Sequence, residues 1–100
     1  MTKVFISQPM NGMTDDEIMR ERERAIVAAR KALGEVEVLD SFFEDVPEDA
    51  TPLWYLGQSI LVLAQADVAY FVRGWETARG CLIEHACAAK YGISTIEEWE

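Results

Sequence analysis

Residues 67–92 constrain the fold more than any other stretch, because an apolar run, a glycine-punctuated loop and a helix follow one another directly. The run over residues 68–72 (VAYFV) is too short for a helical period and is typical of a strand buried on both faces of a parallel sheet. A polar loop over residues 73–80 follows, and then a helix over residues 81–91 that Gly92 closes as a left-handed cap. This order places Glu84 just beyond the carboxyl end of a parallel strand, where open α/β sheets bind ligands. We therefore take Glu84 as the chemical centre.

The remaining chain alternates strand and helix patterns in the same way. Thr14 with Glu17 three residues later forms a capping box, and Thr51 precedes a proline at the first helical position, so both mark helix starts. The predicted strands cover residues 4–7, 35–39, 68–72 and 93–96, and the predicted helices cover residues 14–33, 51–66 and 81–91. This order predicts one α/β domain over residues 1–100: a small, doubly wound, flavodoxin- or Rossmann-like parallel sheet of about four strands with three helices.

Several polar or glycine positions each keep two interpretations. The alternating charges of residues 20–24 are typical of a solvated helix face, with a phosphate-binding arginine as the alternative. Asp40 is either a turn residue or an acceptor for a ligand hydroxyl. Gly57 weakens its helix by about 1 kcal/mol, which favours close approach of a neighbour or ligand there. Asp67 is expected to cap the preceding turn, with a replacement catalytic acid as the alternative. Residues 97–100 are expected to trail off as an acidic tail.

The composition excludes several classes of function. A net charge of -9 opposes binding to a nucleic-acid polymer, which needs a basic face, but it is compatible with a small anionic ligand held by glycine loops or helix N-termini. No apolar run approaches the roughly 20 residues of a membrane span, and the first residues lack a signal-peptide layout, so we expect a cytoplasmic protein with no membrane partner. Cys81 and Cys87 match no disulfide or zinc spacing, and His85 is the only histidine. The sequence therefore predicts no metal site and no cofactor.

Three segments together resemble the nucleoside 2-deoxyribosyltransferase superfamily, and more narrowly its small phage and bacterial branch. They are KVFISQPMNG at the start, SILVLAQADVAYF where a helix joins a strand, and ARGCLIEHACAAKYGI. The most specific part is the ordered set Gly80, Glu84, Ala86 and Gly92. The resemblance implies that Glu84 attacks C1′ of a (deoxy)ribonucleoside and forms a covalent glycosyl-enzyme, from which a second base or water takes the sugar.

The helix N-terminus beside Glu84 is expected to help keep this carboxylate ionised. The alternative is a helix-start glutamate that only complements the helix dipole.

The chain departs from the superfamily at positions that assist the nucleophile. Characterised members carry an aspartate eight residues before the aspartate of the A-D-V segment, and Ser59 stands at that position here. A serine cannot protonate a departing base as a carboxylic acid does. Nucleotide hydrolase relatives have a tyrosine in the first strand and an arginine in the following loop, where this chain has Val4 and Met10. We expect Ser59 to orient water or substrate.

Two functional hypotheses follow. The first is N-glycosidic bond cleavage or deoxyribosyl transfer on a nucleoside or nucleotide, with Glu84 and Ser59 as catalytic residues. The predicted substrate-binding residues are Ser7, Gln8, Pro9, Asn11, Gly12, Asp40, Gly74, Trp75 and Gly80. The second hypothesis is a nucleotide-binding protein without turnover, a sensor or a sponge, which the loss of the second carboxylate favours.

A third hypothesis assigns the chain no activity of its own: it is an oligomerisation module with a vestigial pocket. The interface would then be formed by exposed Phe42, Phe43, Trp54 and Tyr55. The resemblance implies a homodimer or larger homo-oligomer under all three hypotheses. A neighbouring subunit would then be able to supply the missing acid.

Overall fold

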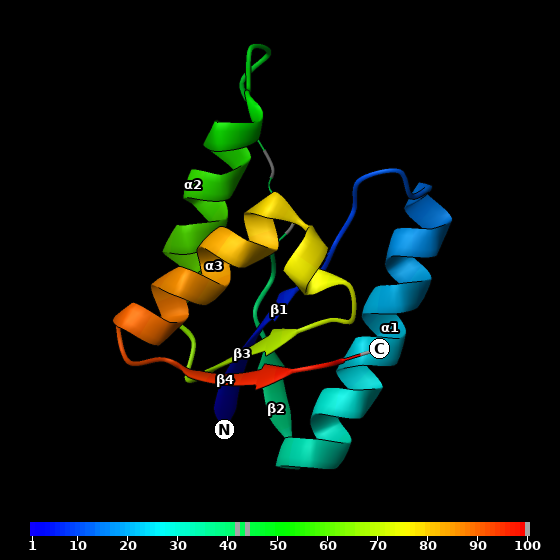
Figure 1. The fold of residues 1–100 in the computed structure, drawn as a ribbon, viewed down its shortest axis with the longest axis vertical. Helices are drawn as coiled ribbons and strands as arrows, with labels where there is room; N and C mark the ends of the chain where they lie inside the picture. Colours follow the sequence, from blue (N-terminus) through cyan, green and yellow to red (C-terminus); the bar gives the residue numbers. More distant parts are fainter. Residues whose placement is uncertain (42, 44, 100) are drawn as a thin grey trace.

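The computed structural model describes residues 1–41, 43 and 45–99. Within these residues the strands are β1 (Thr2–Ser7), β2 (Val36–Val38), β3 (Val68–Phe71) and β4 (Ser94–Glu97), and the α-helices are α1 (Asp15–Leu33), α2 (Pro52–Leu63) and α3 (Arg79–Lys90). A short 3-10 helix, η1 (Trp75–Thr77), precedes α3. The strands form one parallel sheet in the order β2-β1-β3-β4 (Figure 1). The predicted α/β fold with a small doubly wound sheet is confirmed.

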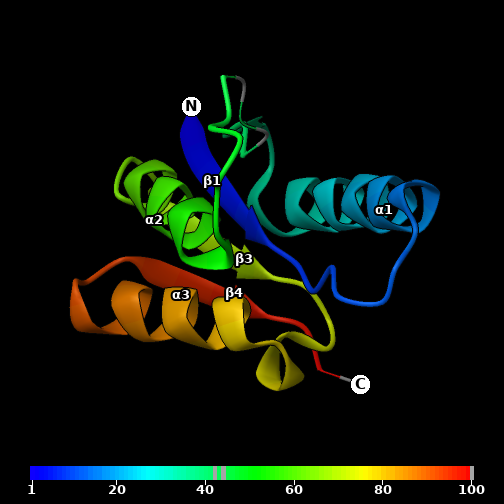
Figure 2. The ribbon, with the colours of Figure 1, turned by 90° about the horizontal axis from the view of Figure 1, so that it is seen from above.

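The helices cover the two faces of the sheet unequally, with α1 on one face and α2 and α3 on the other (Figure 2). Side chains alternate along each strand, so the sheet contributes to two separate cores. Val4 and Ile6 of β1 pack on the α1 side against Ala25 and Ala29. Phe5, between them, belongs to the other core, which also contains residues of α2, β3 and α3.

Local sequence signals set the starts of α1 and α2. The side chain of Thr14 accepts a hydrogen bond from the backbone N–H of Glu17, and the Glu17 carboxylate accepts one from the backbone N–H of Thr14, which completes the predicted capping box. Thr51 caps α2 in the same way through the N–H of Trp54. Gly34 and Gly92 have φ angles of 81° and 76°, the left-handed conformation that favours glycine after a helix.

Element ends differ from the predictions in two places that matter for the site. Helix α2 ends at Leu63, with Ala64 as its C-cap, and not at residue 66. Helix α3 begins at Arg79, two residues before the predicted start, and its approach contains η1. Glu84 is therefore the sixth residue of α3 and lies beyond the first helical turn.

The expectation that residues 97–100 trail off is wrong for the described part of that segment. Glu97 is the last residue of β4, and the backbone N–H of Glu98 donates to the carbonyl of Phe71 at 2.9 Å. The indole of Trp99 contacts that of Trp75 in a T-shaped arrangement, with ring centroids 5.2 Å apart. The segment continues β4 and packs on the body of the protein, because the edge strand still has backbone partners beyond Glu97.

The interpretation of residues 20–24 as a wholly solvated face is also wrong at Arg22. Arg22 is buried, and its Nη2 atom donates to the carbonyl oxygen of Leu39 at 3.3 Å. Burial lowers the pKa of this guanidinium, and the charge of Asp40 opposes that shift. Alternation of charge along a sequence does not exclude burial, because the long apolar stem of arginine packs while its head reaches a partner.

The carboxylate of Asp67 accepts a hydrogen bond from the backbone N–H of Lys3 at 2.8 Å, and so ties the entry of β3 to β1 instead of capping the turn before it. Among the described residues no helix is long and apolar enough to cross a membrane.

Candidate functional site

The candidate site lies at the carboxyl ends of β1 and β3. The helices that follow these neighbouring strands, α1 and α3, lie on opposite faces of the sheet, so the loops after the strands diverge (Figure 2). In open α/β sheets this divergence opens a crevice where ligands bind. Pro9, after β1, and Gly74, after β3, lie side by side: a Cβ atom at Gly74 would be 3.5 Å from Cγ of Pro9. Gly74 has a φ of 89°, so its conformation also favours glycine.

Ser7 and Glu84 meet at this edge. Ser7 is the last residue of β1, and its Oγ donates a hydrogen bond of 2.7 Å to Oε1 of Glu84. Both residues are buried, Glu84 with 7% of its surface exposed. Within the part of the chain that the structure describes, Ser7 is the hydrogen-bond partner of this carboxyl, and no lysine or arginine pairs with it.

This environment corrects the expectation that the helix N-terminus keeps Glu84 ionised. Burial raises the pKa of the Glu84 carboxyl to about 7, although the hydrogen bond from Ser7 lowers it. The helix dipole acts mainly within the first turn, and Glu84 lies beyond it. The carboxyl therefore exchanges its proton near neutral pH, the range in which general acids, bases and nucleophiles operate.

Cys81 lies one turn before Glu84 on α3 and is also buried. Burial raises the pKa of its thiol to about 11; a hydrogen bond with Ser7 lowers it, and the charge of Glu84 raises it further. The thiol is thus protonated at neutral pH and is a poor nucleophile. Cys81 and Cys87 are both free, as their spacing predicts.

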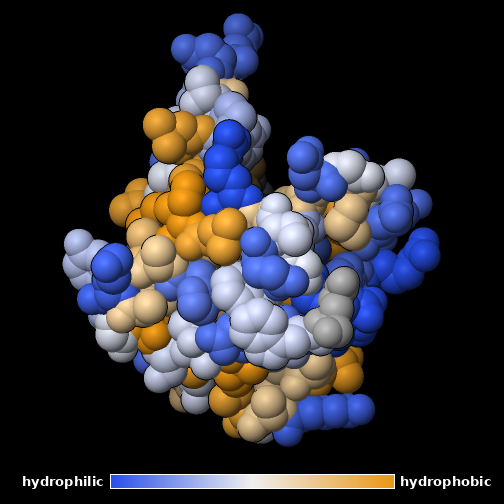
Figure 3. All heavy atoms as spheres, in the orientation of Figure 1, coloured by the Kyte–Doolittle hydropathy of each residue, from blue (hydrophilic) through white to orange (hydrophobic). Residues whose placement is uncertain are grey.

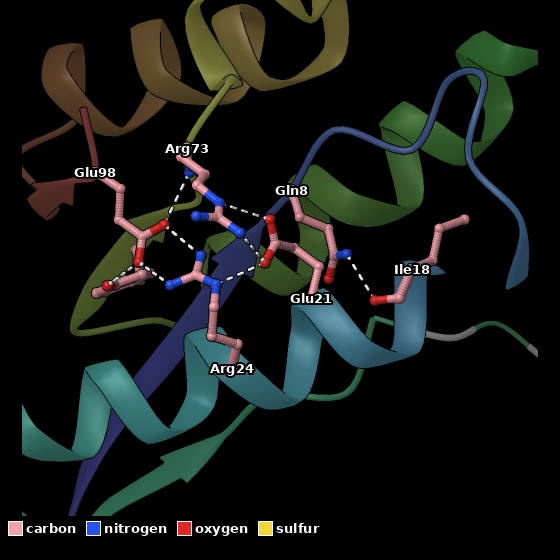
Figure 4. A network of polar contacts seen from close by, with 7 residues as sticks. Gln8, Ile18, Glu21, Arg24, Arg73 and Glu98 are labelled. Carbon is pink, nitrogen blue, oxygen red and sulfur yellow. Dashed lines mark hydrogen bonds and ion pairs between the residues drawn. The ribbon is translucent and has the colours of Figure 1, made fainter. Parts of the chain in front are cut away.

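Gln8 directly follows Ser7 and extends to the other face of the sheet, toward α1. Its Nε2 donates to the carbonyl oxygen of Ile18 at 3.0 Å (Figure 4), whereas its Oε1 is buried without a hydrogen-bond partner among the described residues. Leaving a buried acceptor unpaired costs about 1–3 kcal/mol. Such an atom is available to an N–H or O–H group of a ligand, and the binding role of Gln8 stays a prediction.

A network of charged groups lies next to Gln8, between α1 and the segments after β3 and β4 (Figure 4). The Glu98 carboxylate accepts hydrogen bonds from Nη1 and Nη2 of Arg24 at 3.1 and 2.6 Å, and from the hydroxyl of Tyr70 at 2.5 Å. Glu21 accepts from Nε of Arg24 at 2.6 Å and from Nε and Nη2 of Arg73 at 3.0 and 3.3 Å. Glu98 thus joins the end of the described chain to α1 and β3.

The network borders a surface hollow of about 440 Å³, called here the arginine hollow. It is lined by Met13, Glu17, Arg20, Glu21, Arg24 and Arg73. Three of the nine basic residues of the chain gather here, together with two glutamates, of which Glu21 pairs with Arg24 and Arg73. The sequence carries no signal that places Arg73, Glu21 or Glu98 in this network. Arg20 and Arg24 lie within residues 20–24, for which a phosphate-binding arginine is the alternative interpretation.

The other predicted site residues are spread around this edge. Ser59 lies on α2, which packs against α3, but no hydrogen bond links it to Glu84 in the described structure. Asn11 and Gly12 occupy an exposed turn after β1, and Asp40 is exposed after β2, near Arg22. Gly80 is the second residue of α3, with open space at its Cβ position.

Trp75, predicted to bind substrate, is buried and already has partners. Its ring stacks on His85 with centroids 4.4 Å apart, and its Nε1 donates to the carbonyl oxygen of Glu98 at 3.2 Å. His85 in turn places Nε2 3.0 Å from the carboxylate of Glu97. These contacts attach η1 to α3 and to the segment after β4.

Phe42, one of the predicted interface residues, lies outside the described residues. Phe43 packs edge-on against Trp54, with ring centroids 6.1 Å apart, and Tyr55 is partly exposed. Over the described chain, no group of three or more His, Cys, Asp or Glu side chains is placed to hold a metal ion.

Comparison with known proteins gives one match. The model of a family described as "Domain of unknown function (DUF4406)" matches residues 2–97, almost the whole chain. No curated protein and no solved structure matches this chain.

Proposed function

The chain belongs to the DUF4406 family of domains of unknown function, and from that premise we propose that it cleaves or transfers the N-glycosidic bond of a nucleoside or nucleotide, with Glu84 as the nucleophile. The proposal rests on one observation above all: a buried carboxyl at the switch point of the sheet, held by a single serine hydroxyl. An ionised carboxylate that is buried without a cation is costly. A carboxyl that is buried at this cost is a candidate catalytic group.

The chemistry follows from the two protonation states that a pKa of about 7 makes accessible. In the ionised state, Oε2 of Glu84 forms a bond to C1′ of the sugar while the bond from C1′ to the base nitrogen breaks. The electron pair leaves with the base, which takes up a proton from solvent water; when water later attacks C1′, it returns a proton to the solvent. Water or a second base then attacks C1′, displaces the carboxylate and completes hydrolysis or transfer.

Ser7 contributes by orienting the carboxyl, because its hydrogen bond engages Oε1 and leaves the second oxygen for the sugar. The superfamily resemblance supports the same assignment for Glu84. Ser59, on the adjoining helix, would orient the attacking water.

The arginine hollow favours a phosphorylated substrate. Arg73 uses Nε and Nη2 on Glu21, which leaves Nη1 as a donor, and the Arg20 side chain has no hydrogen bond among the described residues. A guanidinium with free N–H groups suits the oxygens of a phosphate. We therefore rank a nucleoside 5′-monophosphate above the free nucleoside.

Nucleotide binding without turnover is the second candidate, because α2 (Pro52–Leu63) contains no acidic residue that could protonate the departing base. A sensor or sponge would use the same sheet edge and the same arginine hollow without bond cleavage.

The decisive experiment incubates the pure protein with deoxyribonucleosides and ribonucleosides and with their 5′-monophosphates. Free base is measured by chromatography and a sugar adduct by intact-mass spectrometry. We expect base release or an adduct of the wild type, greater with monophosphates, and loss of at least 100-fold in Glu84→Gln, which keeps the shape of the side chain but not its charge. The matched control is Glu23→Gln on the exposed side of α1, which should leave the rate unchanged.

Binding of a monophosphate with no base released would contradict the enzymatic proposal and support the second candidate. Release that persists in Glu84→Gln would contradict the assignment of the nucleophile.

A further inference from the structure

Glu21 occupies N–H groups of two arginines that line the arginine hollow (Figure 4). Its Oε1 accepts hydrogen bonds from Nε of Arg24 at 2.6 Å and from Nη2 of Arg73 at 3.3 Å, and its Oε2 accepts one from Nε of Arg73 at 3.0 Å. Three donors from two separate segments, α1 and the loop after β3, thus converge on one carboxylate. Arginine binds phosphate through the same paired N–H groups, so this arrangement also suits the oxygens of a phosphate.

Glu98 holds both arginines independently of Glu21. Its carboxylate accepts hydrogen bonds from Nη1 and Nη2 of Arg24 and, at 2.9 Å, from the backbone N–H of Arg73. The guanidinium of Arg24 and the backbone of Arg73 therefore stay in place when Glu21 moves away. The three donors that Glu21 uses would then be open to a ligand.

The surroundings of Glu21 allow its carboxylate to leave the arginines. The side chain is 18% exposed and lines a hollow of about 440 Å³, so it has space and contact with water. Figure 3 shows hydrophilic residues gathered over α1, the helix that carries Glu21, so a displaced carboxylate enters a polar environment. Glu17 lies four residues earlier on the same helix and lines the same hollow, and like charges at this spacing repel one another.

Glu21 also sets the charge of the hollow. The lining contains three arginines and two glutamates, so three positive and two negative charges leave a net charge of +1. A phosphate monoester carries roughly two negative charges near neutral pH. Without the charge of Glu21 the lining would carry a net charge of +2, which equals that of the phosphate in magnitude.

We propose that Glu21 is an internal competitor for the arginine hollow: its carboxylate occupies Arg24 and Arg73 in the free protein, and the phosphate of the ligand takes its place. The proposal rests on the proposed function for the identity of the phosphate-bearing ligand. A ligand carboxylate offers these arginines nothing that the tethered Glu21 does not already supply, whereas a phosphate offers three oxygens and a larger charge. Glu21 is thus a specificity-determining residue that favours phosphate over carboxylate ligands.

The test measures the dissociation constant of inorganic phosphate by isothermal titration calorimetry at pH 8 and constant ionic strength. We expect Glu21→Gln to bind phosphate about tenfold more tightly than the wild type, because a neutral amide competes less well for the arginines. Glu21→Ala, which has no side-chain oxygen, should bind at least as tightly as Glu21→Gln. Acetate should not displace phosphate from the wild type. Circular dichroism checks that the variants are folded.

Glu17→Gln is the matched control, because it removes one negative charge from the same hollow. Glu17 accepts its hydrogen bond from the backbone N–H of Thr14, and glutamine can keep this capping box. Phosphate binding should therefore tighten by less than about threefold in this variant. Combining Glu21→Gln with Arg73→Gln should abolish the tenfold gain, because the gain depends on the N–H groups that Glu21 releases.

Unchanged or weaker phosphate binding in Glu21→Gln overturns the proposal and would mean that Glu21 orients the arginines for the ligand. Equal gains in Glu17→Gln and Glu21→Gln overturn it too, because charge alone would then explain both. No phosphate binding by any of the proteins, or displacement of phosphate by acetate in the wild type, also contradicts it.

Failure of this proposal can be distinguished from failure of the proposed function, because the phosphate measurement needs no turnover. Tighter phosphate binding in Glu21→Gln, with no base released from monophosphates by the wild type, supports the internal competitor and contradicts the enzymatic proposal. Base release by the wild type, with equal phosphate affinity in Glu21→Gln, contradicts the internal competitor and supports the enzymatic proposal.

Discussion

Two features of its surroundings set the pKa of the Glu84 carboxyl. Burial in the protein interior raises this pKa, and the hydrogen bond from the Ser7 hydroxyl lowers it. The interior has the larger effect, so the carboxyl is partly protonated at neutral pH. A nucleophile of this kind is active only in its ionised fraction, which grows as the pH rises through about 7.

The same pKa makes a prediction for stability. The folded protein holds the Glu84 proton up to about pH 7, whereas the unfolded chain releases it near the ordinary value of 4.5. The folded state therefore binds more protons between these values, and the free energy of unfolding should fall by about 3 kcal/mol as the pH rises from 4.5 past 7. Glu84→Gln should abolish this fall, so that the variant is the more stable protein at pH 8. Urea unfolding at pH 4.5, 6 and 8, at fixed protein concentration, measures it.

Glu23→Gln is the control for this measurement. Because Glu23 is exposed, this variant should show the same dependence of the free energy of unfolding on pH as the wild type. If the free energy of unfolding depends on pH equally in Glu84→Gln and in the wild type, Glu84 ionises in the folded protein as it does in the unfolded chain.

Ser7→Ala tests how far the hydrogen bond from Ser7 lowers the pKa of Glu84. Removing the hydroxyl removes the hydrogen bond that lowers the pKa of Glu84, so this pKa should rise above about 7. Carbon-13 NMR of the glutamate carboxyl groups, followed over a pH titration, gives the value directly, without any assay of activity. Ser94→Ala, at an exposed position of β4, is the control. A lower pKa in Ser7→Ala would mean that water or another donor replaces the hydroxyl.

At the scale of elements, Glu98 connects α1, β3 and the segment after β4. Burial raises the pKa of its carboxyl, but hydrogen bonds from Arg24, Tyr70 and the backbone of Arg73 together lower it to about 2. The stability that these bonds contribute is fully present above about pH 4.5 and is lost as the pH falls toward 2. This trend is opposite to that of Glu84, so stability should be greatest near pH 4.5–5.

Glu98→Gln should lower the free energy of unfolding at pH 7 by about 2 kcal/mol, because it removes the negative charge opposite Arg24 and replaces one of the two acceptor oxygens by an NH2 group that cannot accept. Thermal or urea unfolding measures the loss. Glu76→Gln, on the exposed side of η1, should change stability by less than about 0.5 kcal/mol. A double-mutant cycle with Arg24→Gln should show coupling, and additive losses would mean that the ion pair contributes little.

The starts of α1 and α2 could be predicted from the sequence because the groups that set them are local, whereas α3 has no side-chain cap and begins two residues before its predicted start. Thr14 and Glu17 satisfy each other within four residues, and Thr51 is followed at once by proline. The packed segment after β4 could not be predicted in this way. Glu98 and Arg24 are 74 positions apart, and nothing in an acidic ending distinguishes a paired glutamate from a solvated one.

The contrast between local signals and contacts distant in sequence also applies to the candidate site when the whole molecule is considered. The strand–loop–helix order of residues 67–92 was sufficient to place Glu84 near a sheet edge. The partner Ser7 comes from the other end of the chain, 77 positions away, and meets Glu84 because β1 pairs with β3 in the middle of the sheet. The burial that sets the pKa of Glu84 and the arginines that line the hollow depend on packing between elements, which periodicity does not specify.

Helix α2 contains no acidic or basic side chain and no histidine, so no proton is gained or lost on this helix itself. Its neighbour α3 carries the carboxyl of Glu84, whose pKa of about 7 makes its charge change near neutral pH. A shift of acidity would therefore alter one of the two helices on this face of the sheet and leave the charge of the other as it was.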